Sequence, residues 1–582
     1  MAAWLDPADL RVGLGCMRLS TDADRDDTRA AATIAAAAGA GVVVFDTAHA
    51  YGADDSDAGH NERVLAAALR AAGAADRARI VTKGGMTRPS GRWQPDGRAG
   101  TIRRHCEESL VALDGMPIDL YLIHAPDPRV PWRTTMRALG RLVDAGLVRR
   151  VGVCNVNRRL LEEAVDLAPV SAVQIAISIF DDAAVRGGVV DRCTDLGIAV
   201  LAHSPLGGPR RSNRLERNPT IADIASRSGV PAAEVALAGL LDLAPDVVAL
   251  PGARRPDTAR SAAHAAQLQL SESDRVRLRE AYAATRPSRP TAPHRQPSGG
   301  EVVAVMGIPG AGKTDLADVY ARRGFLRLNR DLRGGTLKEL ATGLESSLRD
   351  GVLNVVLDNT YLSRASRSHV IDAAAQHGRL SRCIWLDTPV DQAQVNLVMR
   401  MLDRFGELPS PEALLAVARA EPGLMLPTSF LRTVRELEPP TTDEGWDALD
   451  RVSFSRRQDE LTAGAVFVAA EVLTQPDWRN AVQHTDPSRP HLVFDWREGG
   501  APPDLDDVAA SLRAVVDGLV DVAVCPHPGG PPSCWCRPPL PGLPLAFAHR
   551  HQLNPARSVL VGLTATHRRL SAAIGARYVQ AS

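Results

Sequence analysis

The segment Gly307-Ile-Pro-Gly-Ala-Gly-Lys-Thr314 constrains the fold of this chain more than any other feature. It follows the apolar run Val302 to Met306 and precedes a helix-like stretch, and a phosphate-binding loop needs this strand–loop–helix context. Its backbone N–H groups can surround phosphates, Lys313 can reach the β- and γ-phosphates, and the Thr314 hydroxyl can bind Mg²⁺. The sequence therefore predicts an α/β domain that binds ATP and Mg²⁺. The expected binding residues are Gly307, Gly310, Gly312, Lys313 and Thr314.

Length and composition limit the remaining possibilities. At 582 residues the chain is too long for one core, and about 150 residues per domain predicts three or four domains. Because 68 basic residues balance 68 acidic ones, no global field attracts nucleic acid or a membrane, so any nucleic-acid site has to be a local groove. Eight cysteines form no dense disulfide framework, and we see no signal-like start or apolar run of about 18 residues. We expect a cytoplasmic protein without a membrane span.

The pattern of apolar runs predicts a multidomain α/β chain. Short runs such as Val42–Phe45 and Leu120–Ile123 alternate with alanine-rich helical patterns, which is typical of a (β/α)8 TIM barrel. The stretch Arg286–Gly300 is rich in Pro, Ser, Gly and Arg and indicates a semi-stiff linker. A strand-like run, Ala465–Val468, opens a further α/β region. We expect a barrel over residues 1–284, a linker over 285–300, a P-loop domain with a parallel sheet over 301–456 and a third domain over 460–582.

Four polar residues lie at or just after strand ends of the expected barrel: Asp46, Tyr51, Lys83 and His124. A tyrosine can protonate the alkoxide formed by hydride transfer if a nearby ammonium lowers its pKa. A carboxylate can hold that ammonium, and a histidine can orient the carbonyl group. The sequence therefore predicts catalytic residues for the reduction of a carbonyl compound at the carboxyl ends of the barrel strands.

These residues, with the segments Gly13–Ser20, Val151–Asn155 and Ser204–Leu206, resemble the aldo-keto reductase family in order and spacing. The resemblance implies NADP(H) as cofactor and a small carbonyl substrate. Cys154 and His203 depart from the Ser and Tyr that the family usually has there, so a barrel that binds the cofactor without turnover remains an open alternative. The resemblance implies that Asn155 and Gln174 hold the nicotinamide amide, Ser204 and Leu206 the pyrophosphate, and Arg254, Arg255 or Arg260 the 2′-phosphate.

Two carboxylates follow strand-like runs in the expected P-loop domain. Asp331 follows Phe325–Leu328 and can accept a proton from an incoming hydroxyl. Asp358 ends an apolar run, where it can hold Mg²⁺ directly or through water. Arg400 and Arg404 lie four apart on an expected helix and share a face that can close over phosphates; a solvated basic face explains this pair equally well.

The segments Asn329–Asp331, Asp358–Thr360 and Phe430–Trp446 resemble, in the same order, the kinase domain of polynucleotide kinase-phosphatases. The resemblance implies phosphorylation of a 5′-hydroxyl end of a nucleic acid, RNA slightly ahead of DNA, during repair. It implies that Asp331 is the general base. It also implies that Arg330, Arg333 or Arg367 contacts the acceptor strand. Two alternatives stay open. One is a kinase for a small alcohol that the barrel produces, and the other is a kinase regulated by a non-catalytic, NADP(H)-sensing barrel.

The expected third domain carries four metal-binding residue types in one short loop: Cys525, His527, Cys534 and Cys536. Their number and type suit a tetrahedral, structural Zn²⁺. The loop and its flanks resemble the zinc-loop phosphatases of the haloacid dehalogenase (HAD) superfamily that act on heptose bisphosphate and histidinol phosphate. In that likeness Ala469-Ala-Glu471 stands where two aspartates belong, and Leu563 where a third belongs. Without the nucleophile no aspartyl-phosphate can form, so we expect a HAD-like pseudo-phosphatase.

Overall fold

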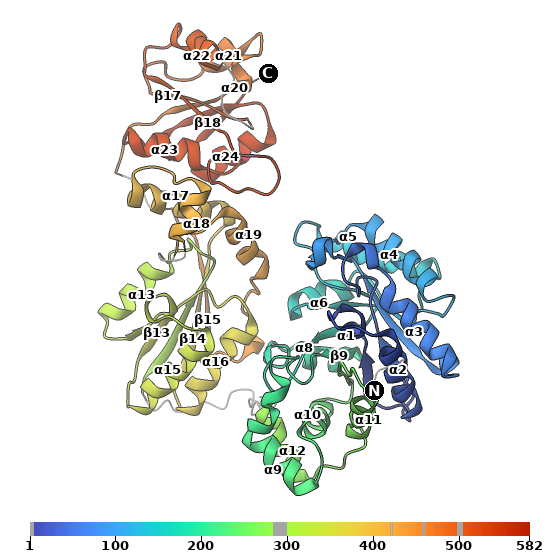
Figure 1. Ribbon diagram of the computed structural model, residues 1–582. Helices are drawn as coiled ribbons and strands as arrows, with labels where there is room; N and C mark the ends of the chain where they lie inside the picture. Colours follow the sequence, from blue (N-terminus) through green and yellow to red (C-terminus); the bar gives the residue numbers. More distant parts are fainter. Residues whose placement is uncertain are drawn as a thin grey trace. The chain divides into compact units, whose positions relative to one another are not determined.

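The computed structural model describes residues 5–282, 299–418, 421, 423–456, 460–497 and 505–581. The chain forms two compact units whose main boundary lies between Arg295 and Gln296: a barrel unit, and a P-loop unit that contains the P-loop domain and the third domain (Figure 1). The expected linker over 285–300 falls almost entirely outside the described residues. Within the described ranges, no helix combines the length and the apolar composition needed to cross a membrane.

The barrel unit contains eight parallel strands in the order β1-β2-β3-β6-β7-β8-β9-β10, which confirms the predicted α/β barrel. A parallel bridge between Val12 and Ala249 joins its first and last strands. The strands are β1 Gly13–Gly15, β2 Val44–Asp46, β3 Arg79–Gly84, β6 Leu120–Ile123, β7 Val151–Cys154, β8 Val170–Ala176, β9 Ala199–His203 and β10 Val247–Leu250, and a small hairpin joins β4 Met86–Thr87 to β5 Gln94–Pro95.

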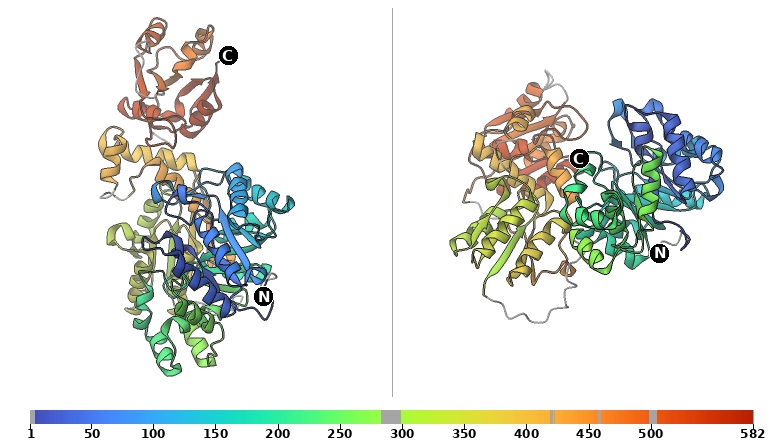
Figure 2. Two further views of the ribbon diagram at one scale, coloured as in Figure 1. Left: turned by 45° about the vertical axis from the view of Figure 1, so that its right-hand side comes forward. Right: turned by 60° about the horizontal axis from the view of Figure 1, so that its bottom comes forward.

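Helices connect the barrel strands, and the views of Figure 2 show them outside the strands. They are α1 Met17–Thr21, α2 Asp27–Gly39, α3 His60–Ala71, α4 Ala99–Ala112, α5 Trp132–Asp144, α6 Arg158–Val165, α7 Ala183–Arg186, α8 Val189–Leu196, α9 Pro219–Ser228, α10 Ala232–Leu241, α11 Pro256–Ala265 and α12 Glu272–Ala281. Short 3-10 turns are η1 Asp55–Asp57, η2 Ala75–Arg77, η3 Pro89–Gly91 and η4 Ser212–Arg217.

Alternate strand residues of the barrel enter two different cores. Leu122 and Leu201 belong to the cluster inside the barrel, whereas their neighbours Ile123 and Val200 pack in the layer beneath the helices. This alternation follows from the two-residue period of a strand. Both faces are therefore buried, so most strand positions are apolar, and the polar residues Asp46 and Lys83 lie toward the strand ends.

The P-loop domain has a five-stranded parallel sheet in the order β12-β13-β11-β14-β15. Its strands are β11 Glu301–Met306, β12 Leu326–Leu328, β13 Val355–Asp358, β14 Leu380–Asp387 and β15 Ala448–Ser453. Its helices are α13 Lys313–Arg322, α14 Arg330–Arg333, α15 Leu337–Arg349, α16 Arg364–Gln376, α17 Val390–Phe405, α18 Pro411–Val417 and α19 Pro427–Glu436, with a 3-10 turn, η5, at Thr442–Glu444. The central strand β11 runs directly into the glycine loop, as the sequence predicts.

The third domain has another five-stranded parallel sheet, in the order β18-β17-β16-β19-β20. Its strands are β16 Val466–Ala469, β17 His491–Trp496, β18 Val520–Cys525, β19 Val559–Gly562 and β20 Arg577–Gln580. Its helices are α20 Ala470–Leu473, α21 Trp478–Gln483, α22 Leu505–Arg513, α23 Gly542–Arg550 and α24 Ala565–Ile574, with η6 at Pro555–Arg557. The predicted additional α/β sheets are therefore present.

One apolar cluster continues from the P-loop domain into the third domain. It includes Leu397 and Met401 of α17 together with Phe547 of α23 and Ile574 of α24. Figures 1 and 2 show α17 between the two sheets. The Trp535 indole donates a hydrogen bond to a P-loop-domain backbone carbonyl, that of Met425, at 2.8 Å. The two domains thus bury their apolar faces against each other, because neither face is covered by its own domain alone.

Candidate functional site

The four polar residues expected at the barrel strand ends lie in one site. Lys83 is fully buried, and its Nζ donates to the two carboxylate oxygens of Asp46 at 2.7 and 2.9 Å. The same Nζ contacts the Tyr51 hydroxyl at 3.0 Å and the Thr47 carbonyl at 2.8 Å. The His124 ring lies edge-on to the Tyr51 ring, with 5.6 Å between centroids. A hydroxyl, an ammonium, a carboxylate and an imidazole therefore converge at the carboxyl ends of the strands.

Burial and charge set the protonation states of this site. Burial raises the pKa of Tyr51, and the Lys83 ammonium opposes that rise. Burial alone would lower the pKa of Lys83, but the Asp46 carboxylate outweighs it and the net pKa is raised. Burial and, secondly, the charge of Lys83 hold the pKa of His124 well below its usual value. At neutral pH the site therefore contains a neutral tyrosine beside an ammonium, and a neutral imidazole.

Sequence reasoning missed a tryptophan, Trp93, that lines one side of this site. The Trp93 ring lies 6.2 Å from the Tyr51 ring and 5.8 Å from the His124 ring, between centroids. The Arg88 guanidinium covers another part of the indole, 4.2 Å from its centroid. Trp93 precedes the two-residue strand β5, and no periodic pattern predicts where such a connection folds back. Its exposed ring gives the mouth of the site an aromatic wall.

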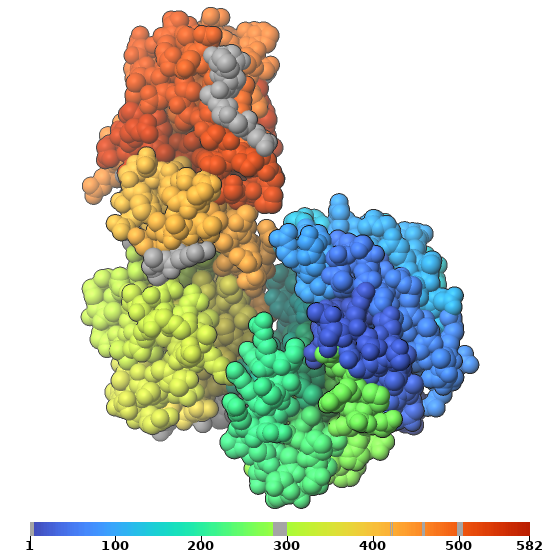
Figure 3. Space-filling model, in the orientation of Figure 1, coloured from blue at the N-terminus to red at the C-terminus, as the bar shows by residue number. Residues whose placement is uncertain are grey.

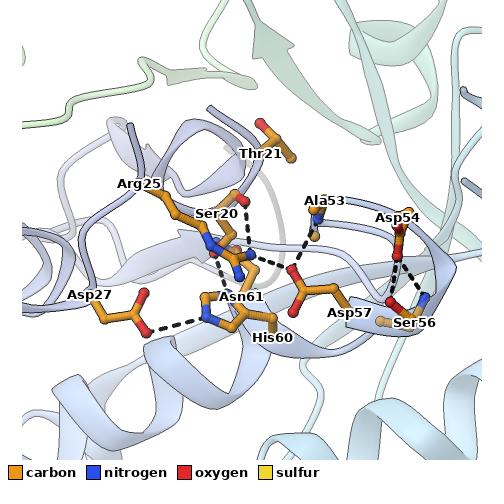
Figure 4. A network of polar contacts seen from close by, with 12 residues as sticks. Ser20, Thr21, Arg25, Asp27, Ala53, Asp54, Ser56, Asp57, His60 and Asn61 are labelled. Atoms are coloured by element: carbon orange, nitrogen blue, oxygen red, sulfur yellow. Dashed lines mark hydrogen bonds and ion pairs between the residues drawn. The ribbon is translucent and has the colours of Figure 1, made fainter. Parts of the chain in front are cut away.

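Polar contacts fix the loop that carries Tyr51, and Figure 4 shows those made by Asn61 and Asp57. Asn61, at the start of α3, is buried and donates to the Ser20 hydroxyl at 2.8 Å. Its side-chain oxygen accepts from the Thr47 hydroxyl at 2.7 Å. The Asp57 carboxylate accepts from the Ala53 backbone N–H at 3.0 Å and pairs with Arg25. Both ends of the loop are therefore tied down, which holds the Tyr51 hydroxyl beside Lys83.

Two of the expected nicotinamide-binding residues border the same site. Asn155 is exposed and has a φ of 56°; its Nδ2 donates to the His124 carbonyl at 3.2 Å, and its Oδ1 lies 3.1 Å from Nε2 of His203. Gln174 is buried and donates to Asp46 Oδ1 at 2.7 Å. Ser204 is exposed, with a φ of 53°. The amide of Asn155 thus reaches the mouth of the barrel, whereas Gln174 also supports the buried carboxylate.

A cavity of about 560 Å³ lies on the same unit. Its wall includes Arg18, Arg29, Leu206, Arg254 and Arg255. Arg254 pairs with Asp24 at 2.6 Å, whereas Arg255 is exposed at the N-terminus of α11. Arg260 is not among the lining residues and pairs with Asp257 at 2.9 Å. Of the three arginines expected to bind a 2′-phosphate, two therefore line one cavity and the third points to its own helix.

The glycine loop of the P-loop unit has the conformation that its sequence requires. Gly310 and Gly312 have φ of 81° and 90°, values that glycine adopts without strain. A Cβ on Gly310 would lie 2.5 Å from the carbonyl oxygen of Ala393. Lys313 begins α13, and its Nζ donates to the carbonyls of Gly307 and Ile308 at 3.0 and 2.9 Å. Burial lowers the pKa of Lys313 to about 8.

The two expected carboxylates of the P-loop domain have different surroundings. Asp358 is buried; Arg327 contacts its two oxygens at 3.2 and 2.5 Å, and Asn329 donates to Oδ1 at 2.8 Å. Asp331 is exposed by 43% and pairs with its neighbour Arg330 at 3.2 Å. The charges of both carboxylates oppose the effect of burial on the pKa of Lys313, that of Asp358 more strongly than that of Asp331. Sequence reasoning missed Arg327, although a cation within a short apolar strand was a signal.

The arginines expected near the phosphates and the acceptor are spread over several elements. Arg400 donates to the Gly423 carbonyl at 3.3 Å, and its charge contributes to the pKa of Lys313. Arg404 instead pairs with Glu421 at 3.0 and 3.1 Å. Of the two, Arg400 lines a cavity beside the glycine loop, whereas Arg404 is not among its lining residues. The expected acceptor-strand arginines lie on α14 and α16: Arg330, Arg333 and Arg367.

The four expected metal ligands of the third domain come together, with one candidate atom from each within 4.8 Å of the others. Cys525 Sγ lies 3.4 Å from His527 Nδ1, 3.5 Å from Cys534 Sγ and 3.2 Å from Cys536 Sγ. Cys525 is the last residue of β18, and the other three lie in the loop that follows. Three thiols and an imidazole at such separations form a donor set that fits Zn²⁺.

Comparisons with known proteins agree with the barrel and with the P-loop. Residues 11–283 match the family model described as the Aldo/keto reductase family, and residues 302–421 match one described as an AAA domain. Residues 11–283 are therefore an aldo/keto reductase domain, and a P-loop, kinase-like domain follows it in the same chain.

Solved structures that match this chain include aldo-keto reductases and a glycerol dehydrogenase. The thermostable aldo-keto reductase Tm1743 in complex with the inhibitor epalrestat is 31% identical, covering 47% of this chain and 94% of that chain, with a TM-score of 0.40. An aldo/keto reductase from Klebsiella pneumoniae in complex with NADP and acetate is 25% identical over 47% and 91% of the two chains, with a TM-score of 0.41. The glycerol dehydrogenase of Gluconobacter oxydans is 24% identical over 50% and 97%, with a TM-score of 0.42.

Proposed function

We propose that the chain is a bifunctional enzyme. Its barrel reduces a small carbonyl compound with NADP(H), and its P-loop unit transfers the γ-phosphate of ATP to the 5′-hydroxyl end of a polynucleotide, RNA slightly ahead of DNA. The reductase proposal rests on the contact of Lys83 Nζ with both the Asp46 carboxylate and the Tyr51 hydroxyl. The kinase proposal rests on the glycine loop, whose Lys313 begins α13, and on the exposed carboxylate of Asp331, which follows strand β12 of the same sheet.

In the barrel, the chain's own residues supply the proton and the orientation. Tyr51 donates its proton to the carbonyl oxygen, and the adjacent Lys83 ammonium stabilises the phenolate that remains. Asp46 keeps Lys83 charged and in place, and the neutral imidazole of His124 orients the carbonyl group. The bound NADPH supplies a hydride.

The residues present fit that cofactor. Asn155 and Gln174, which contact His124 and Asp46, would hold the nicotinamide amide. Leu206, which lines the 560 Å³ cavity, and Ser204, directly after β9, would hold the pyrophosphate. Arg255, exposed on that cavity, would bind the 2′-phosphate, with Arg254 beside it. These assignments are part of the proposal.

The reductase half is tested by NADPH oxidation with a panel of aldehydes and ketones. Wild-type protein should oxidise NADPH with at least one small carbonyl compound. Tyr51→Phe should bind NADPH equally well, as measured by fluorescence, and lose turnover, because the ring stays and only the proton donor is removed. Tight NADPH binding without turnover of any substrate by the wild type would reject the reductase and favour a cofactor-sensing barrel.

In the P-loop unit, Asp331 accepts the proton of the 5′-hydroxyl as its oxygen attacks the γ-phosphorus, and the bond to the ADP leaving group breaks. Lys313 and Arg400 stabilise the charge on the transferring group. Thr314, exposed at the start of α13, can offer its hydroxyl to Mg²⁺. Asp358 would act through a water, since Arg327 and Asn329 already contact its oxygens.

The kinase half is tested with γ-labelled ATP and 5′-hydroxyl RNA and DNA oligonucleotides. Wild-type protein should label one or both polymers, and Lys313→Ala should not. Labelling of neither polymer would reject the polynucleotide acceptor. Transfer to a small alcohol, in step with NADPH consumption, would then support the alternative of a small-molecule kinase coupled to the barrel.

We further propose that Cys525, His527, Cys534 and Cys536 hold a structural Zn²⁺, because three thiols and an imidazole form a complete tetrahedral set with no open position for substrate. The end of β16 supports a pseudo-phosphatase, since Ala469 and Ala470 offer no nucleophile there. Metal analysis of the double variant Cys534→Ser, Cys536→Ser tests this. Loss of zinc with retained phosphate transfer is expected, and retained zinc would contradict the ligand assignment.

A further inference from the structure

A cavity of about 1600 Å³ opens beside the glycine loop of the P-loop unit. The glycine loop and α13 form one wall, with Gly310, Gly312 and Thr314, and the segment after β15 forms a second. The third domain supplies another wall, from α23 through η6. We propose that this cavity binds the nucleoside of ATP, so that the third domain forms part of the nucleotide site. The inference rests on the proposed use of ATP.

The order of the strands supports this placement. The glycine loop follows the central strand β11, Asp331 lies after the edge strand β12, and the cavity is lined by residues of β14 and β15 on the opposite side. A triphosphate on the glycine loop that directs its γ-phosphate toward Asp331 therefore extends its other end to the β14–β15 side. The nucleoside then enters the cavity, while the acceptor hydroxyl approaches from the β12 side.

The cavity lining has the chemistry of a nucleoside site. Val319, Met399 and the Phe454 ring offer apolar surface for a base, and Ser455 and Gln552 add hydrogen-bonding groups. Three acidic and three basic side chains line it, so the lining has no excess of positive charge of the kind that a strand of phosphates needs. The acidic residues are Asp315, Asp403 and Asp450, and the basic residues other than histidine are Arg400, Arg456 and Arg557.

The third-domain wall is fastened to the P-loop domain. Arg456 donates to the carbonyls of Ala573 and Ile574, each at 2.7 Å. Gln392 of α17 also donates to the Ala573 carbonyl, at 2.8 Å, and on the same helix Asn396 donates to the Gly310 carbonyl at 2.7 Å. One helix therefore contacts both the glycine loop and the third domain. Figure 3 shows the third domain, in orange and red, directly against the amber segment that contains this helix.

A comparison of two ligands separates the glycine loop from the cavity. Inorganic tripolyphosphate needs only the loop, whereas the non-hydrolysable ATP analogue AMP-PNP needs the loop and the cavity. Ala556 is exposed and lines the cavity, so Ala556→Trp fills the space without disturbing a packed core. Calorimetric titration of the full chain with Mg²⁺ should show AMP-PNP binding at least tenfold weaker in this variant, and tripolyphosphate binding within twofold of wild type.

Two further variants complete the test. Ala510→Trp is the matched control, because Ala510 is exposed on α22 and is not among the residues that line the cavity; both ligands should bind as in wild type. Arg557→Gln, on the cavity wall, should weaken the binding of AMP-PNP more than the binding of tripolyphosphate. This loss of AMP-PNP affinity should be smaller than the loss in Ala556→Trp.

The outcomes separate this inference from the proposed kinase. If Ala556→Trp leaves AMP-PNP affinity unchanged, or weakens both ligands equally, the third domain is not a nucleoside wall even when the wild type binds ATP. If wild-type protein binds neither ligand, the proposed use of ATP fails, and this inference fails with it.

Discussion

A lysine has opposite surroundings in the barrel site and in the P-loop site. In the barrel, Lys83 has 0% exposure and contacts a carboxylate, a hydroxyl and a carbonyl of its own domain. In the P-loop domain, Lys313 donates to two loop carbonyls. Of the two carboxylates whose charges raise its pKa, Asp358 acts more strongly but is already paired with Arg327, and Asp331 is 43% exposed. The first lysine has its counter-charge in the protein, and the second relies on a ligand to bring it. The barrel should therefore be organised before substrate arrives, whereas the P-loop site is completed by its substrates.

The largest expected effect tests the organisation of the barrel. Lys83→Met should lower kcat/KM for carbonyl reduction by about 10⁴-fold, because the proton donor loses the ammonium that stabilises its anion. It should also destabilise the barrel by about 3–5 kcal/mol, since the Asp46 carboxylate is left buried and unpaired. NADPH oxidation and denaturant unfolding measure the two effects.

The double variant Asp46→Asn, Lys83→Met is the control for that experiment. It should regain stability without regaining activity, because no buried charge remains. A stable, active Lys83→Met enzyme would show that the ion pair does not organise the barrel.

The second largest effect tests the P-loop site, which we expect its substrates to complete. Asp331→Asn should lower phosphate transfer by about 10³-fold, because the side chain can no longer accept a proton. Unlike Lys83→Met, it should change the free energy of unfolding by no more than ~0.5 kcal/mol, since the carboxylate is exposed. AMP-PNP affinity should be unchanged in calorimetry, and normal transfer by this variant would reject Asp331 as the base.

A smaller effect concerns pH. The pKa of Lys313 is lowered to about 8, and a triphosphate binds the ammonium rather than the amine. Below pH 8 Lys313 is charged, so AMP-PNP affinity should not change with pH through this residue. Above pH 8 the affinity should fall by up to about tenfold per pH unit, as Lys313 loses its proton. Lys313→Arg is the matched control, since a guanidinium stays charged and should give a flat profile up to pH 10. Parallel profiles for the two proteins would contradict the lowered pKa.

The smallest effect tests which arginine of the barrel unit binds the 2′-phosphate of NADPH. Arg255→Ala should weaken NADPH binding about fivefold, or ~1 kcal/mol, and leave NADH binding unchanged, because only the 2′-phosphate contact is removed. Arg260→Ala should change neither, since Arg260 pairs with Asp257 and is not part of the cavity wall. Fluorescence titration with both cofactors measures this, and equal losses for NADPH and NADH would contradict the phosphate assignment.

Much of the fold could be predicted because buried parallel strands are apolar along their whole length. Leu120–Ile123 is a strand with the expected bounds. The first barrel strand, Gly13–Gly15, shows no apolar run, because the barrel closes tightly there. A Cβ on Gly13 would lie 2.7 Å from Leu250 and 2.9 Å from Val44. A close approach of this kind selects glycine and removes the pattern that identifies a strand.

The candidate sites could be predicted where a residue's position along a strand fixes its place. Asp46 and Lys83 meet because both belong to the carboxyl-end region of neighbouring parallel strands. Arg327 and Trp93 were missed, because their partners depend on side-chain direction and on the path of a loop. The apolar core that the P-loop domain shares with the third domain was missed for a related reason. An apolar helix face such as that of α17 indicates that the face is buried, but not which element covers it.

The apolar cluster shared by the P-loop domain and the third domain also affects how this chain is made. A ribosome adds roughly 5–20 residues per second, and it synthesises the third domain after the P-loop domain. Until then Leu397 and Met401 of α17, both 0% exposed in the finished protein, have no third-domain residues to pack against. The nascent P-loop domain thus exposes apolar surface until the third domain has been synthesised, and exposed apolar surface favours aggregation or binding by chaperones. Completion of the third-domain sheet at β20 is therefore the event that gives the preceding domain its mature surface.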